Sequence, residues 1–156
     1  MADTSSVPPG FELLPRGLGF TDSLQPVYRR LEGDSVSFGL EVASQHSNSL
    51  GLCHGGVLMS LADIAAASGV NLSLGQFSGN PTINLAVDFI NPAGQGEWIE
   101  ARPEHVTVKR RFGFCNGAIY VAERMIARFN GTFYLPDHDG LLQPGASVSY
   151  THLRAH

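Results

Sequence analysis

The stretch that decides the fold is Asn48-Ser-Leu-Gly-Leu-Cys-His-Gly-Gly-Val-Leu-Met-Ser-Leu-Ala-Asp-Ile-Ala-Ala-Ala-Ser-Gly-Val-Asn71. A polar loop ends in the three residues His54-Gly55-Gly56, and a long apolar segment follows it. One acidic residue, Asp63, lies inside that segment, and it is the only Asp, Glu, Lys or Arg between Glu41 and Asp88. A lone carboxylate in an otherwise apolar element is the most informative feature of this sequence.

The apolar segment predicts a helix that begins near Gly55 and runs to about Leu74, where Gly75 can stop it. Apolar residues occur on nearly every side of this helix, so it is expected to be buried nearly all round. At ~1.5 Å per residue the helix would be roughly 30 Å long. That length suits a central helix that is wrapped by a sheet.

Five segments around this helix have the character of strands. Apolar and polar residues alternate from Ser35 to Val42, which predicts a half-buried strand before the helix. Short breaks separate four strand-like segments after it, namely Thr82–Ile90, Glu97–Val108, Phe112–Ile119 and Met125–Leu135. One strand, a buried helix and four further strands predict an α+β fold with an antiparallel sheet.

The chain of 156 residues is long enough for one domain with its own core. Residues 1–19 are expected to form an N-terminal tail and a short turn or helix, and residues 20–135 the domain. Residues 136–156 match no element of that domain and are expected to be a disordered or non-native tail. Their last part resembles a translated adapter sequence, so its histidines are not expected to take part in function.

Composition excludes several classes of protein. A hydrophobic content of 43% and a charged content of 15% fit a globular protein without a membrane segment, and the net charge of -4 argues against nucleic acid as a partner. Two cysteines, Cys53 and Cys115, are too few for a disulfide scaffold, and no signal peptide is evident, so a cytoplasmic location is expected. These cysteines and His46 lack the spacing of metal ligands, so no metal is expected.

Three motifs occur at fixed spacing around the apolar helix: Asn48, then Gly51-x-x-His54-Gly55-Gly56, then Leu61-Ala62-Asp63. This pattern resembles that of hotdog-fold acyl-CoA thioesterases of the phenylacetic-acid-pathway type, the PaaI-like family. The resemblance continues through Thr82 and Asp88-Phe89-Ile90-Asn91-Pro92-Ala93 to Asn130-Gly131-Thr132, and it covers about residues 20–135. It implies an antiparallel sheet wrapped around a long central helix, in homodimers that pair edge to edge and often pair again into tetramers.

The resemblance also implies an active site that lies between two copies of the chain. Asn48 and His54-Gly55 would come from one copy, and Asp63 from the other. Asp63 would be the general base or the nucleophile, and the Gly55 N–H would stabilise the oxyanion. Asn48 would orient the attacking water or the carbonyl, and His54 would hold the loop or contact the thioester. Thr82 would supply a second hydroxyl near the water.

A basic cluster, Lys109-Arg110-Arg111, lies at a predicted turn between two strands of an acidic chain. In the family that the chain resembles, this turn contacts the phosphates of coenzyme A, and basic side chains pair well with phosphate oxygens. Phe89-Ile90-Asn91 would line the channel for the pantetheine arm. Coenzyme A would be part of the substrate, so no separate cofactor is expected.

The sequence favours an acyl-CoA thioesterase that releases a free acid and coenzyme A. Two alternatives stay open: a hotdog hydratase or dehydratase, and a non-catalytic acyl-CoA-binding module. Each proposed site residue also has a structural explanation, such as a turn for Asn48 or a loop contact for His54. The acyl group is not identified, and aryl, arylacetyl and short-to-medium acyl chains all remain candidates.

Overall fold

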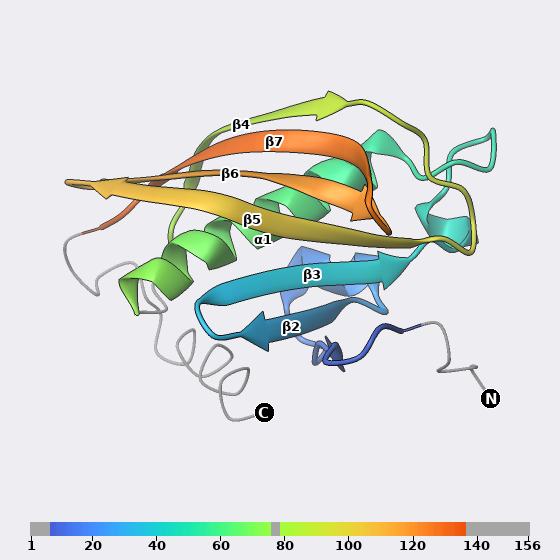
Figure 1. Cartoon of the computed structure of the whole chain (residues 1–156), viewed down its shortest axis with the longest axis horizontal. Coiled ribbons are helices and arrows are strands. Elements are labelled where there is room, and N and C mark those ends of the chain that lie inside the picture. Colours follow the sequence, from blue (N-terminus) through green and yellow to red (C-terminus); the bar gives the residue numbers. More distant parts are fainter. Residues whose placement is uncertain (1–6, 76–78, 137–156) are drawn as a thin grey trace.

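The computed structural model describes residues 7–75 and 79–136. Within these residues, Figure 1 shows one long helix against a curved sheet. The helix α1 is Gly55–Leu74, and two short 3-10 helices are Gly19–Leu24 and Ser44–His46. The strands are β1 (Glu12–Leu13), β2 (Tyr28–Glu32), β3 (Ser35–Glu41), β4 (Thr82–Phe89), β5 (Trp98–Lys109), β6 (Phe112–Val121) and β7 (Arg124–Tyr134).

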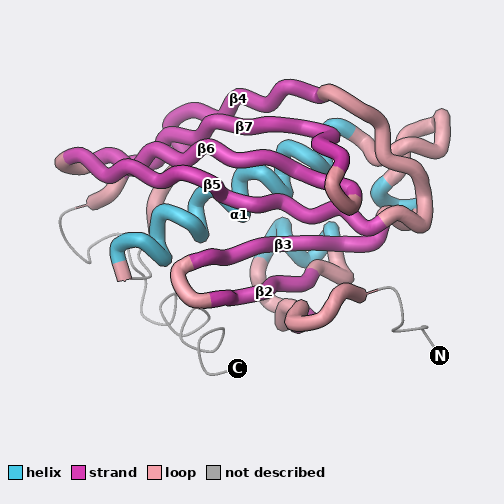
Figure 2. The backbone as a smooth tube through the Cα atoms, in the orientation of Figure 1, coloured by secondary structure: helices cyan, strands magenta, loops and turns pink. Residues whose placement is uncertain are grey.

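All strand pairs are antiparallel, and the order across the sheet is β1-β2-β3-β5-β6-β7-β4. The strand β4 follows α1 in the chain, yet it pairs with β7 at the far edge of the sheet. Its other long edge is unpaired within the part of the chain that the structure describes. Figure 2 shows how the sheet curves around α1, which confirms the predicted α+β architecture.

The helix α1 lies on the concave face of the sheet and packs against β3, β4, β5, β6 and β7. It has the predicted bounds, because His54 caps its start and Gly75 ends it in the left-handed conformation, with a φ of 65°. By length and composition alone α1 could cross a membrane. However, 50% of its most apolar 18-residue stretch is buried inside the protein. Burial against a sheet is the usual reason for such a composition in a core helix.

The expectation that α1 is buried nearly all round is wrong for one side of the helix. Its sheet-facing side is buried, but Asp63, Ile64, Ala67 and Ser68 are only partly buried. All four residues line a pocket, and Ile64 and Ala67 also pack against the core from this side. The sequence could not show this difference, because small and apolar residues suit a core and a pocket wall equally well.

Small residues bring α1 close to the sheet. A Cβ atom at Gly69 would lie 2.9 Å from the Cβ of Pro103, and one at Gly131 would lie 3.4 Å from the Cβ of Ala66. The contact at Gly69 leaves no room for a larger side chain, and at Gly131 a ring carbon of Phe133, 2.7 Å from such a Cβ atom, has the same effect. The helix axis is therefore fixed against β5 and β7, and with it the position of Asp63.

The N-terminal part of the chain differs from the sequence-based expectation. The segment expected to be a turn or helix contains β1, and the structure has a further strand, β2, before the first predicted strand. Leu14 and Leu24, which flank these elements, are buried in the core. Both strands are short and carry charged residues, so the pairing of β1 with β2 and of β2 with β3 was not visible as a hydrophobic pattern. The expected tail at 137–156 lies outside the described residues.

Candidate active site

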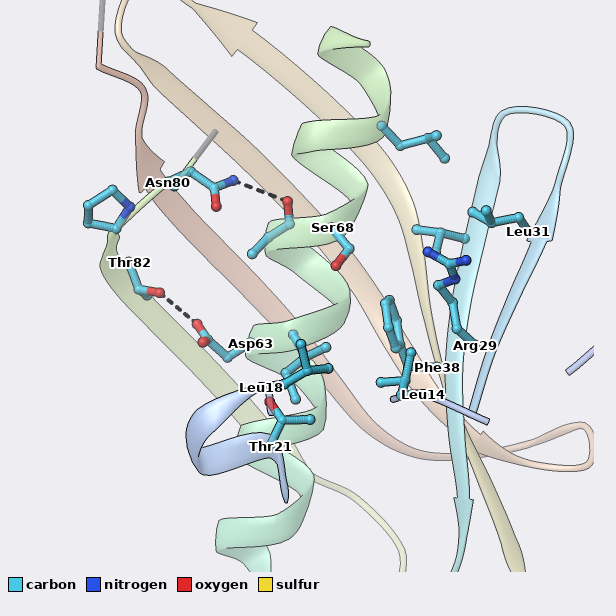
Figure 3. A pocket seen from close by; sticks show the side chains of 16 residues that line it. Leu14, Leu18, Thr21, Arg29, Leu31, Phe38, Asp63, Ser68, Asn80 and Thr82 are labelled. Atoms are coloured by element: carbon cyan, nitrogen blue, oxygen red, sulfur yellow. Dashed lines mark hydrogen bonds between the residues drawn. The ribbon is translucent and has the colours of Figure 1, made fainter. Parts of the chain in front are cut away.

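Asp63 and Thr82 form the centre of the candidate site. The hydroxyl of Thr82 donates a hydrogen bond of 2.7 Å to Oδ1 of Asp63 (Figure 3). Asp63 lies in the middle of α1 and Thr82 at the start of β4, so the fold brings together residues that are 19 positions apart. Asn80 fixes this approach, because its Nδ2 donates to the carbonyl of Ala67 at 3.1 Å.

The two side chains lie on the wall of a pocket of about 590 Å³. This volume is in the range of small-molecule sites in proteins. Its wall is mostly apolar and comes from α1, from β2 and β3, and from the segment before β2; it includes Leu14, Leu18, Leu31, Val36, Phe38, Ile64, Ala67 and Leu72. Asp63 therefore borders an apolar cavity that is open to a ligand, and it is not simply a charge on the surface.

The loop before α1 is held by two side chains. Oδ1 of Asn48 accepts hydrogen bonds from the N–H groups of Leu50 and Leu52, at 2.9 and 3.1 Å. His46 is 1% exposed, and its ring bonds the N–H of Ala43 and the carbonyl of Leu24. The oxygen of Asn48 thus shapes the loop, so Nδ2 is the atom of this side chain that can serve a substrate.

His54 is the N-cap of α1. Its Nδ1 accepts a hydrogen bond of 2.8 Å from the N–H of Gly56. In the neutral ring the proton must then be on Nε2, which makes Nε2 a donor. The side chain is exposed, so His54 holds the loop and can also contact a substrate. The two roles expected for it are compatible.

Gly55 is the first residue of α1 and is partly exposed. Among the described residues we find no acceptor for its N–H, as is usual for the first turn of a helix. A Cβ atom here would lie 3.4 Å from ring atoms of Phe89. The structure therefore places Phe89 beside the proposed oxyanion donor. Nδ2 of Asn91, in contrast, donates to the carbonyl of Met125, and Ile90 is 46% exposed.

The candidate residues fall into separate groups within one chain. Gly55 and Asp63 are eight positions apart on α1, which is ~12 Å along the helix axis. The basic cluster Lys109-Arg110-Arg111 is exposed at the turn between β5 and β6, where Gly113 packs against Val70 near the C-terminal end of α1 (Figure 1). That is the end of the helix opposite Gly55.

Arg29 is a pocket residue that the sequence did not reveal. It lies on β2, is 8% exposed and lines the same pocket as Asp63. Burial lowers the pKa of its guanidinium, and the charge of Glu12 on the neighbouring strand β1 acts in the opposite direction. Because β2 itself was not predicted, nothing in the sequence distinguished Arg29 from an exposed arginine.

The two cysteines are poorly suited to nucleophilic chemistry. Both are buried, and burial raises the pKa of the Cys53 thiol to about 11 and that of Cys115 to about 12. The reactive thiolate is therefore disfavoured at neutral pH. In the described ranges 7–75 and 79–136, no group of three or more His, Cys, Asp and Glu side chains is arranged to hold a metal.

The fold and the site can be compared with known proteins. The sequence model of the Thioesterase superfamily matches residues 50–127, so the chain belongs to this family. A Pseudomonas aeruginosa protein named "Putative esterase PA0474" is 30% identical over 132 residues, which are 84% of this chain and 98% of that protein. Family membership supports thioester hydrolase activity.

Solved structures confirm the hotdog fold. Zebrafish thioesterase superfamily member 2 is 22% identical, covers 78% of this chain and 89% of its own, and superimposes with a TM-score of 0.71. A mutant of the phenylacetic acid degradation protein PaaI from Thermus thermophilus is 26% identical over 70% of this chain and 93% of its own, with a TM-score of 0.63. A Streptococcus pneumoniae protein described as a hypothetical thioesterase and solved with coenzyme A is 18% identical, covers 80% of this chain and 94% of its own, and has a TM-score of 0.64. The resemblance to PaaI-type thioesterases is thus confirmed.

Proposed function

We propose that this protein is an acyl-CoA thioesterase that hydrolyses an acyl- or aryl-CoA to the free acid and coenzyme A. The observation that carries the proposal is the Asp63–Thr82 pair on the wall of an apolar pocket. A carboxylate beside such a pocket can attack a bound thioester or activate water for the attack. The reaction uses no cofactor, since coenzyme A is part of the substrate, and a cytoplasmic location remains part of the proposal.

Asp63 has two chemically complete routes to the product. As a base, it takes a proton from a water molecule whose oxygen attacks the thioester carbon. As a nucleophile, it attacks that carbon itself and forms an anhydride that water then hydrolyses. In both routes the carbonyl oxygen becomes negative, the C–S bond breaks and coenzyme A leaves as a thiol after protonation. Both routes need a hydrogen-bond donor for that oxygen.

We assign this donor role to the Gly55 N–H of a second copy of the chain. The separation of ~12 Å along α1 prevents Gly55 and Asp63 of one chain from reaching the same carbonyl group. The edge of β4 that pairs with no other described strand offers a surface for edge-to-edge pairing of two copies, and Phe89 at the end of β4 lies beside Gly55. In such a dimer Nδ2 of Asn48 and Nε2 of His54 would accompany Gly55.

The basic cluster Lys109-Arg110-Arg111 is proposed to bind the phosphates of coenzyme A. It is exposed in a two-residue hairpin turn, with Arg110 at a φ of 56°. A protein of the same fold has been solved with coenzyme A, which supports a site for this carrier in the fold. The same proposal includes Phe89, Ile90 and Asn91, which would line the channel for the pantetheine arm.

Reversing the charge at Arg110 and Arg111 is expected to raise KM for acyl-CoA about 10-fold or more, because charge-assisted bonds to phosphate are lost. KM for the matching acyl-pantetheine, which lacks the nucleotide phosphates, should change little. Steady-state kinetics with both thioesters measure this difference. Equal effects on the two substrates would remove the cluster from the binding site.

Replacing Thr82 by Val is expected to lower kcat about 10-fold. Valine has nearly the same shape but cannot donate the hydrogen bond that orients Asp63. Replacing Thr82 by Ser, which keeps the hydroxyl, should restore most of the activity. Unchanged kcat in the Val variant would show that this hydrogen bond has no role in turnover.

A hydrolysis assay over a panel of acyl-CoA esters tests the proposed function directly. Free thiol should be released from one or more esters by the unmodified protein, and release should be absent for Asp63→Ala. A protein that binds acyl-CoA but releases no thiol would instead be the non-catalytic binding module. Addition of water to an enoyl-CoA without thiol release would identify the hydratase.

A further inference from the structure

The pocket beside Asp63 extends along α1 toward the C-terminal end of the helix. Asp63 is the first residue of α1 in the pocket lining and Leu72 is the last. They are nine positions apart, which is ~13 Å along the helix axis. Figure 3 shows Leu18 at the level of Asp63, with Ser68 and Leu31 further toward that end. The pocket is therefore elongated, and the carboxylate lies near one end of it.

Part of the pocket wall is held in place by hydrogen bonds within the segment before β2. The carboxylate of Asp22 accepts bonds from the N–H groups of Gly17 and Leu18, at 2.9 and 3.1 Å. Nε2 of Gln25 donates to the carbonyl of Leu14 at 3.2 Å. Leu14 and Leu18 both line the pocket. This wall is thus formed by the chain itself, and the length of the pocket does not depend on a ligand.

Beyond Asp63 the pocket lining is mainly apolar and includes Leu31, Phe38 and Leu72. Arg29 is the only other charged residue of the described lining, and it already interacts with other groups of the protein. The pantetheine arm of coenzyme A has amide groups that would lose water without gaining partners against an apolar wall, whereas a hydrocarbon chain loses no hydrogen bonds there. The pocket therefore suits the acyl chain of a substrate better than its carrier.

Resting on the proposed thioesterase function, we propose that the preferred substrates are CoA esters of unbranched medium-chain acids, whose acyl chain lies in this pocket from Asp63 to Leu72. A fully staggered alkyl chain advances about 1.3 Å per carbon, so a pocket of ~13 Å accommodates about ten carbons. A single aromatic ring would fill only the part next to Asp63. Each added methylene would bury more apolar surface until the chain reaches Leu72.

A series of acyl-CoA esters tests the chain-length preference. The series comprises butanoyl-, hexanoyl-, octanoyl-, decanoyl- and dodecanoyl-CoA, with benzoyl- and phenylacetyl-CoA as aromatic esters. We expect kcat/KM to rise about 2- to 4-fold per methylene up to about ten carbons and then to level off or fall. The aromatic esters should lie below octanoyl-CoA. No rise between butanoyl- and decanoyl-CoA, or the highest value for an aromatic ester, would overturn the inference.

Ser68→Phe connects the preference to the pocket. Ser68 lies about halfway between Asp63 and Leu72, and serine and phenylalanine have similar helix propensities. The ring should block the far part of the pocket, so kcat/KM for decanoyl-CoA should fall about 10-fold or more while that for butanoyl-CoA changes little. Ser73→Phe places the same side chain at an exposed position of α1 outside the pocket lining and should leave the chain-length profile unchanged.

Thermal unfolding checks that both variants are folded. An unchanged profile in a folded Ser68→Phe protein would contradict the inference. Equal losses for butanoyl- and decanoyl-CoA would also contradict it, because the pocket would then hold a part that all CoA esters share.

Leu72→Ala provides a second test that removes bulk instead of adding it. Leu72 is partly buried at the far end of the pocket, so its truncation should make room for a longer chain. The kcat/KM for dodecanoyl-CoA relative to octanoyl-CoA should rise about 3-fold or more. An unchanged ratio would show that Leu72 does not limit the acyl chain.

Failure of this inference differs from failure of the proposed function. If CoA esters are hydrolysed without a chain-length preference that depends on Ser68 and Leu72, the thioesterase proposal stands and only the medium-chain substrate is excluded. If no CoA ester of the series is hydrolysed, the thioesterase proposal fails, and the inference about its substrate fails with it.

Discussion

Replacing Asp63 by Asn is expected to reduce kcat by ~10² or more while the protein stays folded. Asparagine keeps the size of the side chain and an oxygen that can accept the hydrogen bond from Thr82. It lacks the negative charge that a base or a nucleophile needs. The loss should therefore appear in kcat with every acyl-CoA ester that is hydrolysed, and the thermal unfolding temperature should change little, because Asp63 is only partly buried.

Asp88→Asn is a matched control for this experiment. Asp88 lies on β4 and forms an exposed ion pair with Arg128, with both side chains 65% exposed. Exposed pairs of this kind contribute little to stability. The control should keep nearly all activity. If Asp63→Asn turned over acyl-CoA at the rate of the control, Asp63 would be neither base nor nucleophile.

Replacing Gly55 by Val is expected to lower kcat/KM by about 10², a loss comparable to that of an oxyanion donor. A Cβ atom at this position would lie 3.4 Å from the Phe89 ring, in van der Waals contact, and the two methyl groups of valine would add bulk beside the N–H. A thioester carbonyl could then no longer approach the helix start. The first position of a helix tolerates most residues, so the fold should remain intact.

Gly94→Val is the corresponding control. Gly94 lies outside the helix, has no positive φ, and a Cβ atom there would meet only a side-chain oxygen of Glu97 at 3.9 Å. The control should retain activity close to that of the unmodified protein. Full activity in Gly55→Val, measured with the same ester, would exclude the Gly55 N–H as the oxyanion donor.

The helix could be predicted because its signals are local. The apolar run from Gly55 and the terminal Gly75 gave the correct bounds, and Asp63 was conspicuous as the single carboxylate in that run. The hydrogen bond between Asp63 and Thr82 depends on β4 crossing to β7, which is a long-range pairing that no local pattern encodes. The family resemblance, and not the strand pattern, was the reason to consider Thr82.

Other parts of the site depend on packing and could not be predicted. The sequence did not show that Oδ1 of Asn48 is used by its own loop, or that one side of α1 borders a pocket. It also missed β2, whose charged residues hide an alternation in which Arg29 is buried and Arg30 is only partly buried. Neighbouring arginines with such different surroundings can be separated only when the sheet is known.

Each active site is proposed to combine Asp63 of one copy with Gly55 of another. A mixed dimer of Asp63→Asn and Gly55→Val chains tests this arrangement most directly. The two variants carry different affinity tags, are produced together, and the mixed dimer is purified through both tags. One of its two sites then has an intact Asp63 and an intact Gly55, while the other has neither. The mixed dimer is expected to regain about half of the unmodified activity, although each variant alone is nearly inactive. A mixed dimer as inactive as its parents, or a protein that forms no mixed species, would contradict this arrangement.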